Sequence, residues 1–468
     1  MKQADAAEWR QAAVDELAAH QTNGTWTLVD QPKNRPVIGS KWVFTKKYCA
    51  DGSFEHYKGQ LVTQGFSQHP GFEYLEVFTT VHLLTLCIIL VLAAIHDLHL
   101  WSVNVLNAYL NGEMDCDVYM EQPEGFEQGD HKQTVCLLKK VLYGTRQGGI
   151  RWNHKMHTIL ESLGFKQTYS NAAVYIFTQG DVQIILPVFV DDMTFASKSL
   201  DAIKQAITDL MKHFKLRNLG PTTEILDIKI NHNHQKHSLM ISQCQYCVNM
   251  LSHFNMADCK PVMTPIEPGL SLLHDQSPRT AEERNFMCSV DYGGAIGSLQ
   301  YLSCTTRPDI AFAVGQLASF TSDPGVAHWN AIKHLFHYIQ GSLSFGITYS
   351  PDHSSSQLFQ TYSDANHGGC KDSGRSTSAY VVKIGTGVVS WMSKRQPIVA
   401  LSTTEAEYVA ACKAGKEIVW MRKLLQEIGF ESNGPLTLHM DNQSAIQVAK
   451  HPEHHGRMKH LDLRWYWL

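Results

Sequence analysis

Residues 173–197, AVYIFTQGDVQIILPVFVDDMTFAS, decide the fold of this chain. Three apolar, strand-like runs are separated by Gly180-Asp181 and by Asp191-Asp192, which predicts antiparallel strands with the adjacent acids at a hairpin tip. Neighbouring carboxylates repel each other unless a cation neutralises them, so Asp191 and Asp192 are candidate ligands of a divalent metal ion. Such a pair is also common in solvated turns. The apolar runs on both sides favour a site set in a core sheet.

The region upstream supplies a ribbon, a helix and a strand. Residues 41–62, KWVFTKKYCADGSFEHYKGQLV, alternate apolar and polar side chains around Asp51-Gly52, which predicts a lysine-rich hairpin. The apolar run Leu83–Ile95 is shorter than the ~18 residues of a membrane span, so it predicts a helix buried on every side. Residues 101–115, WSVNVLNAYLNGEMD, begin like a strand and end in a turn.

The C-terminal part has a different pattern. Residues 200–345 are mostly helical in pattern, and the polar stretch 350–357 is expected to be a linker. Beyond it the chain predicts a βββαβα order, in which Asp364 ends the first strand, Glu407 lies one turn into the helix and Asp441 ends the fourth strand. Acids so placed can converge at one sheet edge and hold Mg²⁺, although three unrelated surface acids would give the same residue types.

Composition excludes several classes of protein. The 468 residues are 44% apolar and 18% charged, which excludes a disordered or fibrous chain. A formal net charge of −4 means that nucleic acid could bind only through local basic patches. Eleven scattered cysteines, with one CxxC pair and no second pair for a zinc site, favour reduced intracellular thiols. No targeting signal is seen, and no membrane partner is expected.

The chain resembles the reverse transcriptase and ribonuclease H portion of copia-type LTR retrotransposon polyproteins, and the resemblance covers nearly the whole sequence. The collinear motifs that carry it are NGTWTLVDQP, IGSKWVF, YKGQLVTQGFSQHPGFEY, NAYLNGEM, VYMEQPEGF, LYGTRQ, FVDD, SQCQY, GSLQYLSCTTRPDIAFAV, TYSDAN, GRSTSAY, LSTTEAEY, MDNQSAI and RMKHLDL.

The resemblance implies an α+β, right-hand polymerase of fingers, palm and thumb/connection, followed by a ribonuclease H-like domain. The expected domains are 1–235 for fingers and palm, 236–350 for thumb/connection and 358–468 for the C-terminal domain. The last is expected to be C-terminally truncated, because a fourth acid of the family would follow beyond residue 468. By resemblance, the protein is intracellular, in the cytoplasm or in a virus-like particle.

The resemblance also implies the chemistry. Two Mg²⁺ ions, held by a first palm aspartate and the pair Asp191 and Asp192, would promote attack of the primer 3′-hydroxyl on a deoxynucleoside triphosphate. Lys46 or Lys47 would contact the triphosphate, and Tyr109 would stack beside the sugar. Asp364, Glu407 and Asp441 match the metal-binding acids of ribonuclease H. The implied partners are an RNA template, a DNA primer, an RNA–DNA hybrid and deoxynucleoside triphosphates.

The sequence departs from the family at sensitive positions. Asn104 stands where the first metal-binding aspartate is expected, and Gln60 and Gln64 replace two cations of the nucleotide-facing segment. Ile150 replaces an arginine, and Asp227 replaces a turn glycine. An amide keeps the shape of a carboxylate and loses its charge, so metal binding at the polymerase site should weaken. Two hypotheses remain: an impaired polymerase with a ribonuclease H module, or a catalytically inactive relic that retains at most primer-template binding.

Overall fold

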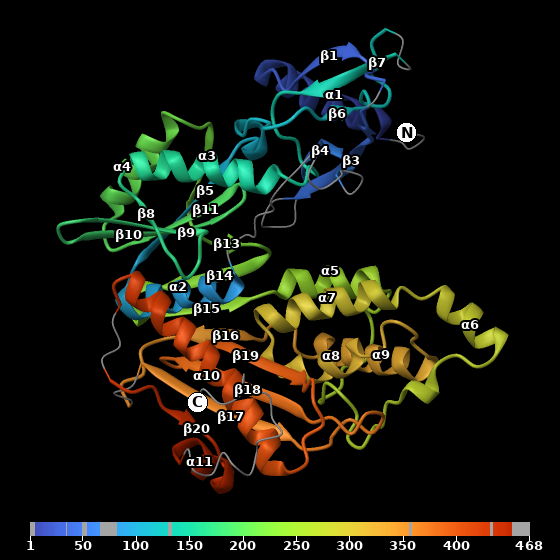
Figure 1. Cartoon of the computed structure of the whole chain (residues 1–468), viewed down its shortest axis with the longest axis vertical. Coiled ribbons are helices and arrows are strands. Elements are labelled where there is room, and N and C mark those ends of the chain that lie inside the picture. Colours follow the sequence, from blue (N-terminus) through green and yellow to red (C-terminus); the bar gives the residue numbers. More distant parts are fainter. Residues whose placement is uncertain are drawn as a thin grey trace.

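The computed structural model describes residues 5–33, 35–48, 54–65, 82–129, 133–354, 358–430 and 434–451. Figure 1 shows a small N-terminal group of elements at the top, a sheet covered by helices below it, and a larger lower body that contains the C-terminal strands. Helices and strands are mixed throughout, which confirms the α+β expectation. The expected turn at Asp51-Gly52 lies outside the described residues.

The N-terminal group contains the predicted lysine-rich ribbon. Its elements are α1 (Ala6–Asn23), β1 (Trp26–Asp30), β2 (Val37–Ile38), β3 (Ser40–Tyr48), β4 (Phe54–Thr63), β6 (Tyr119–Met120) and β7 (Thr134–Leu138). β3 and β4 pair antiparallel, and the other strands form a sheet in the order β1-β7-β6-β2. The ribbon packs on α1, where the ring of Trp9 lies 5.5 Å from Phe44 and 4.4 Å from Tyr57 between centroids.

A six-stranded sheet, which we call the palm sheet, has the order β12-β5-β11-β10-β9-β8. Its strands are β5 (His99–Val105), β8 (Lys166–Gln167), β9 (Val174–Gln179), β10 (Val182–Phe189), β11 (Asp192–Ser197) and β12 (Leu216–Pro221). Because side chains alternate along a strand, Val103 and Met193 face α3 (Gly148–Ser162) and α4 (Leu200–Met211), and Leu100 and Ala196 face the opposite layer.

That opposite layer is built on α2 (Leu83–His96), in which every residue from Thr85 to Ala94 is buried. Its core also takes in residues of the C-terminal strands and of α10, and Figure 1 places α2 between the palm sheet and these elements. A helix enclosed by two layers is apolar all round, as the sequence predicts. In the described ranges, no helix is both long and apolar enough to cross a membrane.

The middle of the chain is less helical than its pattern suggests. A four-stranded sheet of order β13-β14-β15-β16 is built from β13 (Glu224–Ile225), β14 (Ile228–Asn233), β15 (Ser238–Ser242) and β16 (Gly346–Tyr349). The β14–β15 hairpin spans the expected boundary after residue 235. The expectation that 200–345 is mostly helical, with a polar break at 231–237, is therefore wrong for these strands. β12 is mostly exposed, and β13, β14 and β15 have only 2, 6 and 5 residues, so each is too short for its period to stand out from a helical one.

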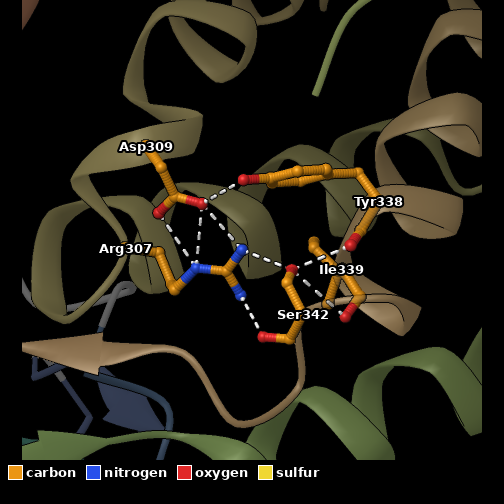
Figure 2. A network of polar contacts seen from close by, with 5 residues as sticks. All are labelled: Arg307, Asp309, Tyr338, Ile339 and Ser342. Atoms are coloured by element: carbon orange, nitrogen blue, oxygen red, sulfur yellow. Dashed lines mark hydrogen bonds and ion pairs between the residues drawn. The ribbon is translucent and has the colours of Figure 1, made fainter. Parts of the chain in front are cut away.

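The helices that follow are α5 (Cys244–His253), α6 (Ala281–Cys288), α7 (Tyr292–Thr305), α8 (Ala311–Ala318) and α9 (Val326–Gln340). A buried guanidinium joins them (Figure 2): Arg307 is 1% exposed and donates from Nε and Nη2 to the Asp309 carboxylate at 2.9 and 2.7 Å. Its Nη1 donates to the Ser342 carbonyl at 3.1 Å. The Tyr338 hydroxyl donates to Asp309 at 2.9 Å, so α9 is tied to the end of α7.

The C-terminal elements follow the predicted βββαβα order. They are β17 (Phe359–Asn366), β18 (Thr377–Ile384), β19 (Gly387–Arg395), α10 (Thr403–Glu427), β20 (Leu438–His439) and α11 (Gln443–Lys450). The sheet order is β19-β18-β17-β20, with β20 parallel to β17. α10 also contacts the loop between β8 and β9, because Glu427 accepts hydrogen bonds from the Ser170 amide at 2.9 Å and hydroxyl at 2.7 Å.

Candidate active sites

The first site is the tip of the β10–β11 hairpin. Asp192 begins β11 and pairs directly with Asn104 of β5. Val190 precedes the acids with φ of 57°, a left-handed conformation that a β-branched side chain rarely adopts. Two hydrogen bonds hold the turn: Trp152 Nε1 donates to the Val190 carbonyl at 2.6 Å, and the Val105 amide donates to the Asp191 carbonyl at 2.7 Å. The two carboxylates are therefore presented beside residue 104.

The Asn104 amide bridges the two acids. Its Nδ2 donates to Asp192 Oδ1 at 2.8 Å and to Asp191 Oδ2 at 3.2 Å. Burial raises the pKa of the Asp192 carboxyl, and the Asp191 charge adds to the rise, whereas the hydrogen bond from Asn104 opposes it. The amide thus presents hydrogen atoms to both carboxylates. This donor set fits Mg²⁺ less well than three carboxylates would, because the amide carries no negative charge and the nitrogen that it directs at the acids is not a ligand of a hard cation.

The lysines of the ribbon divide between its two faces. Lys46 lies on the face toward α1, where its Nζ contacts Asp5 at 2.6 Å and lies 5.1 Å from the centroid of the Tyr57 ring. Lys47 lies on the opposite face, and its charge lowers the pKa of Asp192, as does that of Lys58. Of the two predicted triphosphate contacts, Lys47 is therefore the one directed toward the acids.

Gln60 shares the Lys47 face of the ribbon. It pairs with Val43, an even number of residues from Lys47 along β3, and paired residues of an antiparallel ribbon lie on the same face. An uncharged amide therefore stands on the face that carries Lys47 and Lys58.

Tyr109 lies in the 3₁₀ turn η2 (Ala108–Asn111), directly after β5. Its ring centroid is 4.5 Å from that of Tyr143. Burial raises the pKa of the Tyr109 hydroxyl, and the charge of Asp191 adds to the rise. With Trp152 and Val190, Tyr109 lines a pocket beside the hairpin tip. An aromatic ring at this place can contact a nucleotide sugar bound at the acids.

The second site gathers three acids from β17, α10 and the segment after β20. Asp364, Glu407 and Asp441 each offer a carboxylate oxygen, and these oxygens lie within 4.8 Å of one another. The Ala365 amide donates to Glu407 Oε1 at 3.2 Å, but Glu407 Oε2 is buried and has no hydrogen-bond partner among the described residues. Burial raises the pKa of Glu407 to about 7, and the charges of Asp364 and Asp441 add to the rise. An orphaned, buried oxygen among acids fits a divalent cation.

Residues 23–268 match the protein-family model described as reverse transcriptase (RNA-dependent DNA polymerase). The chain belongs to this reverse transcriptase family. It is 39% identical over 460 residues to the retrovirus-related Pol polyprotein from transposon TNT 1-94 of Nicotiana tabacum, which is 98% of this chain and 34% of that relative. It is 33% identical over 462 residues to the polyproteins of transposons RE2 and RE1 of Arabidopsis thaliana, covering 98% of this chain and 31% of each.

The chain therefore spans about a third of the length of these curated relatives, and the copia-type resemblance is confirmed. A solved structure of a foamy viral protease-reverse transcriptase in complex with double-stranded DNA is similar in fold, with a TM-score of 0.51 at 10% identity. The similarity covers 94% of this chain and 64% of that chain. The polymerase fold of the reverse transcriptase family is thus present.

The residues that the sequence indicated for the two acidic clusters lie together in the structure, but sequence reasoning missed residues that support the hairpin tip and the ribbon. Trp152, which holds the Val190 carbonyl, lies in a predicted helix whose buried face could have marked it. Lys58 was indicated only as a lysine of the ribbon; its pairing with Thr45, which the structure supplies, puts it on the face of Lys47.

Proposed function

We propose that this chain is the reverse transcriptase and ribonuclease H portion of a retrotransposon polyprotein, with an impaired polymerase site and a complete set of three acids at the hydrolytic site. One contrast carries the proposal. At the hairpin tip, a single amide donates to both Asp191 and Asp192, whereas Glu407 at the second site has a buried oxygen with no hydrogen-bond partner in the ranges that the structure describes.

At the polymerase site, Mg²⁺ when bound would lower the pKa of a primer 3′-hydroxyl and neutralise charge that develops on the triphosphate. Asp191 and Asp192 are the residues that would hold it. Asn104 supplies no negative charge, and its amide hydrogens engage the oxygens that a cation needs. The removal of one such electrostatic contributor typically costs on the order of a hundredfold in rate.

At the second site, Mg²⁺ when bound would activate a water molecule and stabilise the leaving oxygen of a phosphodiester. Asp364, Glu407 and Asp441 would hold it. Glu407 is only 6% exposed, so its carboxylate is poorly solvated and is ionised with difficulty near neutral pH. A cation would favour the ionised form, because ligands bind metal in their deprotonated state. The substrate we propose is the RNA strand of an RNA–DNA hybrid.

The proposed partners are an RNA template, a DNA primer and deoxynucleoside triphosphates in addition to the hybrid. The net charge of −4 gives no general attraction for phosphates, so Lys47 and Lys58 on the ribbon must act locally. The structural neighbour was solved in complex with double-stranded DNA, which supports a duplex as the ligand class. We also propose an intracellular location, in the cytoplasm or in a virus-like particle, from the retrotransposon relatives.

A second candidate function is that of a catalytically inactive relic that still holds a primer-template. Backbone conformation favours it at one place: Leu226 and Asp227, at the β13–β14 turn, both have positive φ, of 52° and 58°. Glycine adopts this conformation without strain, and leucine rarely does. Gln60, on the face of the ribbon that carries Lys47, also favours the inactive relic, since it provides no charge for a phosphate.

One protein preparation tests the proposal in two assays with Mg²⁺. We expect cleavage of the RNA strand of an RNA–DNA hybrid, lost in Glu407→Gln, and primer extension on an RNA template near background. Robust primer extension by the unaltered chain would contradict the impairment. Absence of both activities together with measurable hybrid binding would favour the relic.

A further inference from the structure

A separate group of metal-ligating side chains lies where the palm sheet meets the β14–β15 hairpin. Asp97, His232 and His234, which we call the histidine cluster, each offer one ligand atom, and these atoms lie within 4.8 Å of one another. His234 Nδ1 contacts Asp97 Oδ1 at 2.6 Å, and the ring centroids of His232 and His234 are 4.0 Å apart. Neither acidic active site includes any of these residues.

Two distant chain segments bring the cluster together. Asp97 ends α2 in a left-handed conformation, with φ of 54°, directly before β5. His232 lies on β14, and His234 begins the 3₁₀ turn η3 (His234–Lys236), so the Asp97–His234 contact spans 137 residues. A bound ion would therefore link the start of a palm strand to the neighbouring sheet.

His232 supplies an independent indication of a ligand. Its Nε2 atom is buried and has no hydrogen-bond partner within the described part of the chain. Buried polar atoms in native proteins normally have a partner, and a neutral imidazole nitrogen is the form that ligates metals.

The donor set selects the class of ion. Two imidazoles and one carboxylate suit a late first-row divalent metal such as Zn²⁺, whereas Mg²⁺ and Ca²⁺ prefer oxygen ligands. Zinc–nitrogen and zinc–oxygen bonds of about 2.0–2.2 Å place tetrahedral donor atoms about 3.3 Å apart. The ligand atoms of the cluster already lie within 4.8 Å of one another, so side-chain shifts alone can bring them to this spacing.

We propose that Asp97, His232 and His234 form a binding site for a divalent transition-metal ion, with Zn²⁺ as the representative ligand. The ion stabilises the junction of α2, β5 and the β14–β15 hairpin and takes no part in phosphoryl chemistry. The inference is thus independent of the proposed polymerase and hydrolase activities.

Equilibrium dialysis of the whole chain against Zn²⁺, with excess Mg²⁺ to occupy the carboxylate sites, tests this inference. Asp97→Asn removes the charge and keeps a residue that tolerates the left-handed backbone. His232→Phe removes the nitrogen and keeps a planar ring. His213→Asn, at an exposed histidine outside the cluster, is the control. We expect one Zn²⁺ per chain, affinity lowered more than about tenfold by either cluster substitution, and unchanged affinity in the control.

Thermal unfolding gives a second readout that needs no enzymatic activity. Zn²⁺ should raise the Tm of the unaltered chain and of His213→Asn, and should leave the Tm of both cluster variants unchanged. The Tm and circular dichroism of the metal-free variants show whether each is folded. Equal affinity in all four proteins, or an equal loss in the control and the cluster variants, would overturn the proposal.

Discussion

Replacement of Glu407 by glutamine tests whether this buried acid is held ready for a cation. Burial raises its pKa from 4.5 to about 7. Because folding raises the pKa of Glu407, the contribution of this side chain to folding stability is fully present below the unfolded-state pKa. That contribution is lost as the pH rises through the folded-state pKa. The loss reaches 1.36 kcal/mol per pH unit only between the unfolded-state and folded-state pKa values. The metal-free chain should therefore lose about 2.5 kcal/mol of unfolding free energy between about pH 5 and about pH 8, and Glu407→Gln should not show this loss.

Urea denaturation in the presence of a chelator measures this difference at both pH values. Glu282→Gln, at an exposed position of α6, serves as the matched control and should follow the unaltered chain. Added Mg²⁺ should stabilise the unaltered chain above neutral pH and leave Glu407→Gln unaffected. If the unfolding free energies of the unaltered chain and Glu407→Gln change in parallel with pH, the raised pKa of Glu407 is refuted. The inference that its buried oxygen is a cation ligand is then refuted as well.

Three further substitutions have expected outcomes. Lys47→Ala should weaken deoxynucleoside triphosphate binding about tenfold by fluorescence titration, because it removes a charged contact, whereas Lys46→Ala should leave binding unchanged since Lys46 contacts Asp5. Leu90→Ala should cost about 2–5 kcal/mol in denaturant unfolding, because α2 lies inside a core shared by two layers. Asp309→Ala should cost about 3–5 kcal/mol because it leaves the Arg307 guanidinium buried and unpaired; the Arg307→Met variant, which leaves a partly exposed carboxylate, should cost less in the same assay.

Local patterns predicted the elements that surround the sites. The strands on either side of Asp191 follow from apolar runs bounded by turn residues, and the βββαβα order follows from the same kind of signal. The helix α2 was predicted as buried because its apolar residues show no polar face. The position of Asn104 beside the acids came instead from family resemblance, since strand pairing over 88 residues leaves no local trace in the sequence.

What the sequence did not predict depends on tertiary contacts. β12 lies at the edge of the palm sheet with mostly exposed residues, so its sequence lacks a buried alternation. The lysines of the ribbon could not be assigned to a face without knowing that α1, through Trp9, covers one of them. The residues of the histidine cluster come from polar stretches that are far apart in the sequence. Only the packing of these stretches against each other brings the ligand atoms together.

Single-turnover nucleotide addition on an RNA template with Mg²⁺ tests the central claim most directly, in the unaltered chain and in Asn104→Asp. Asn107→Asp adds the same charge nearby, at a position whose φ of 53° tolerates aspartate, and is the control. We predict that Asn104→Asp adds nucleotides at least about a hundredfold faster than the unaltered chain and that the control does not. Equal rates with asparagine and aspartate at residue 104, whether robust or at background, would contradict the claim that this amide limits the polymerase site.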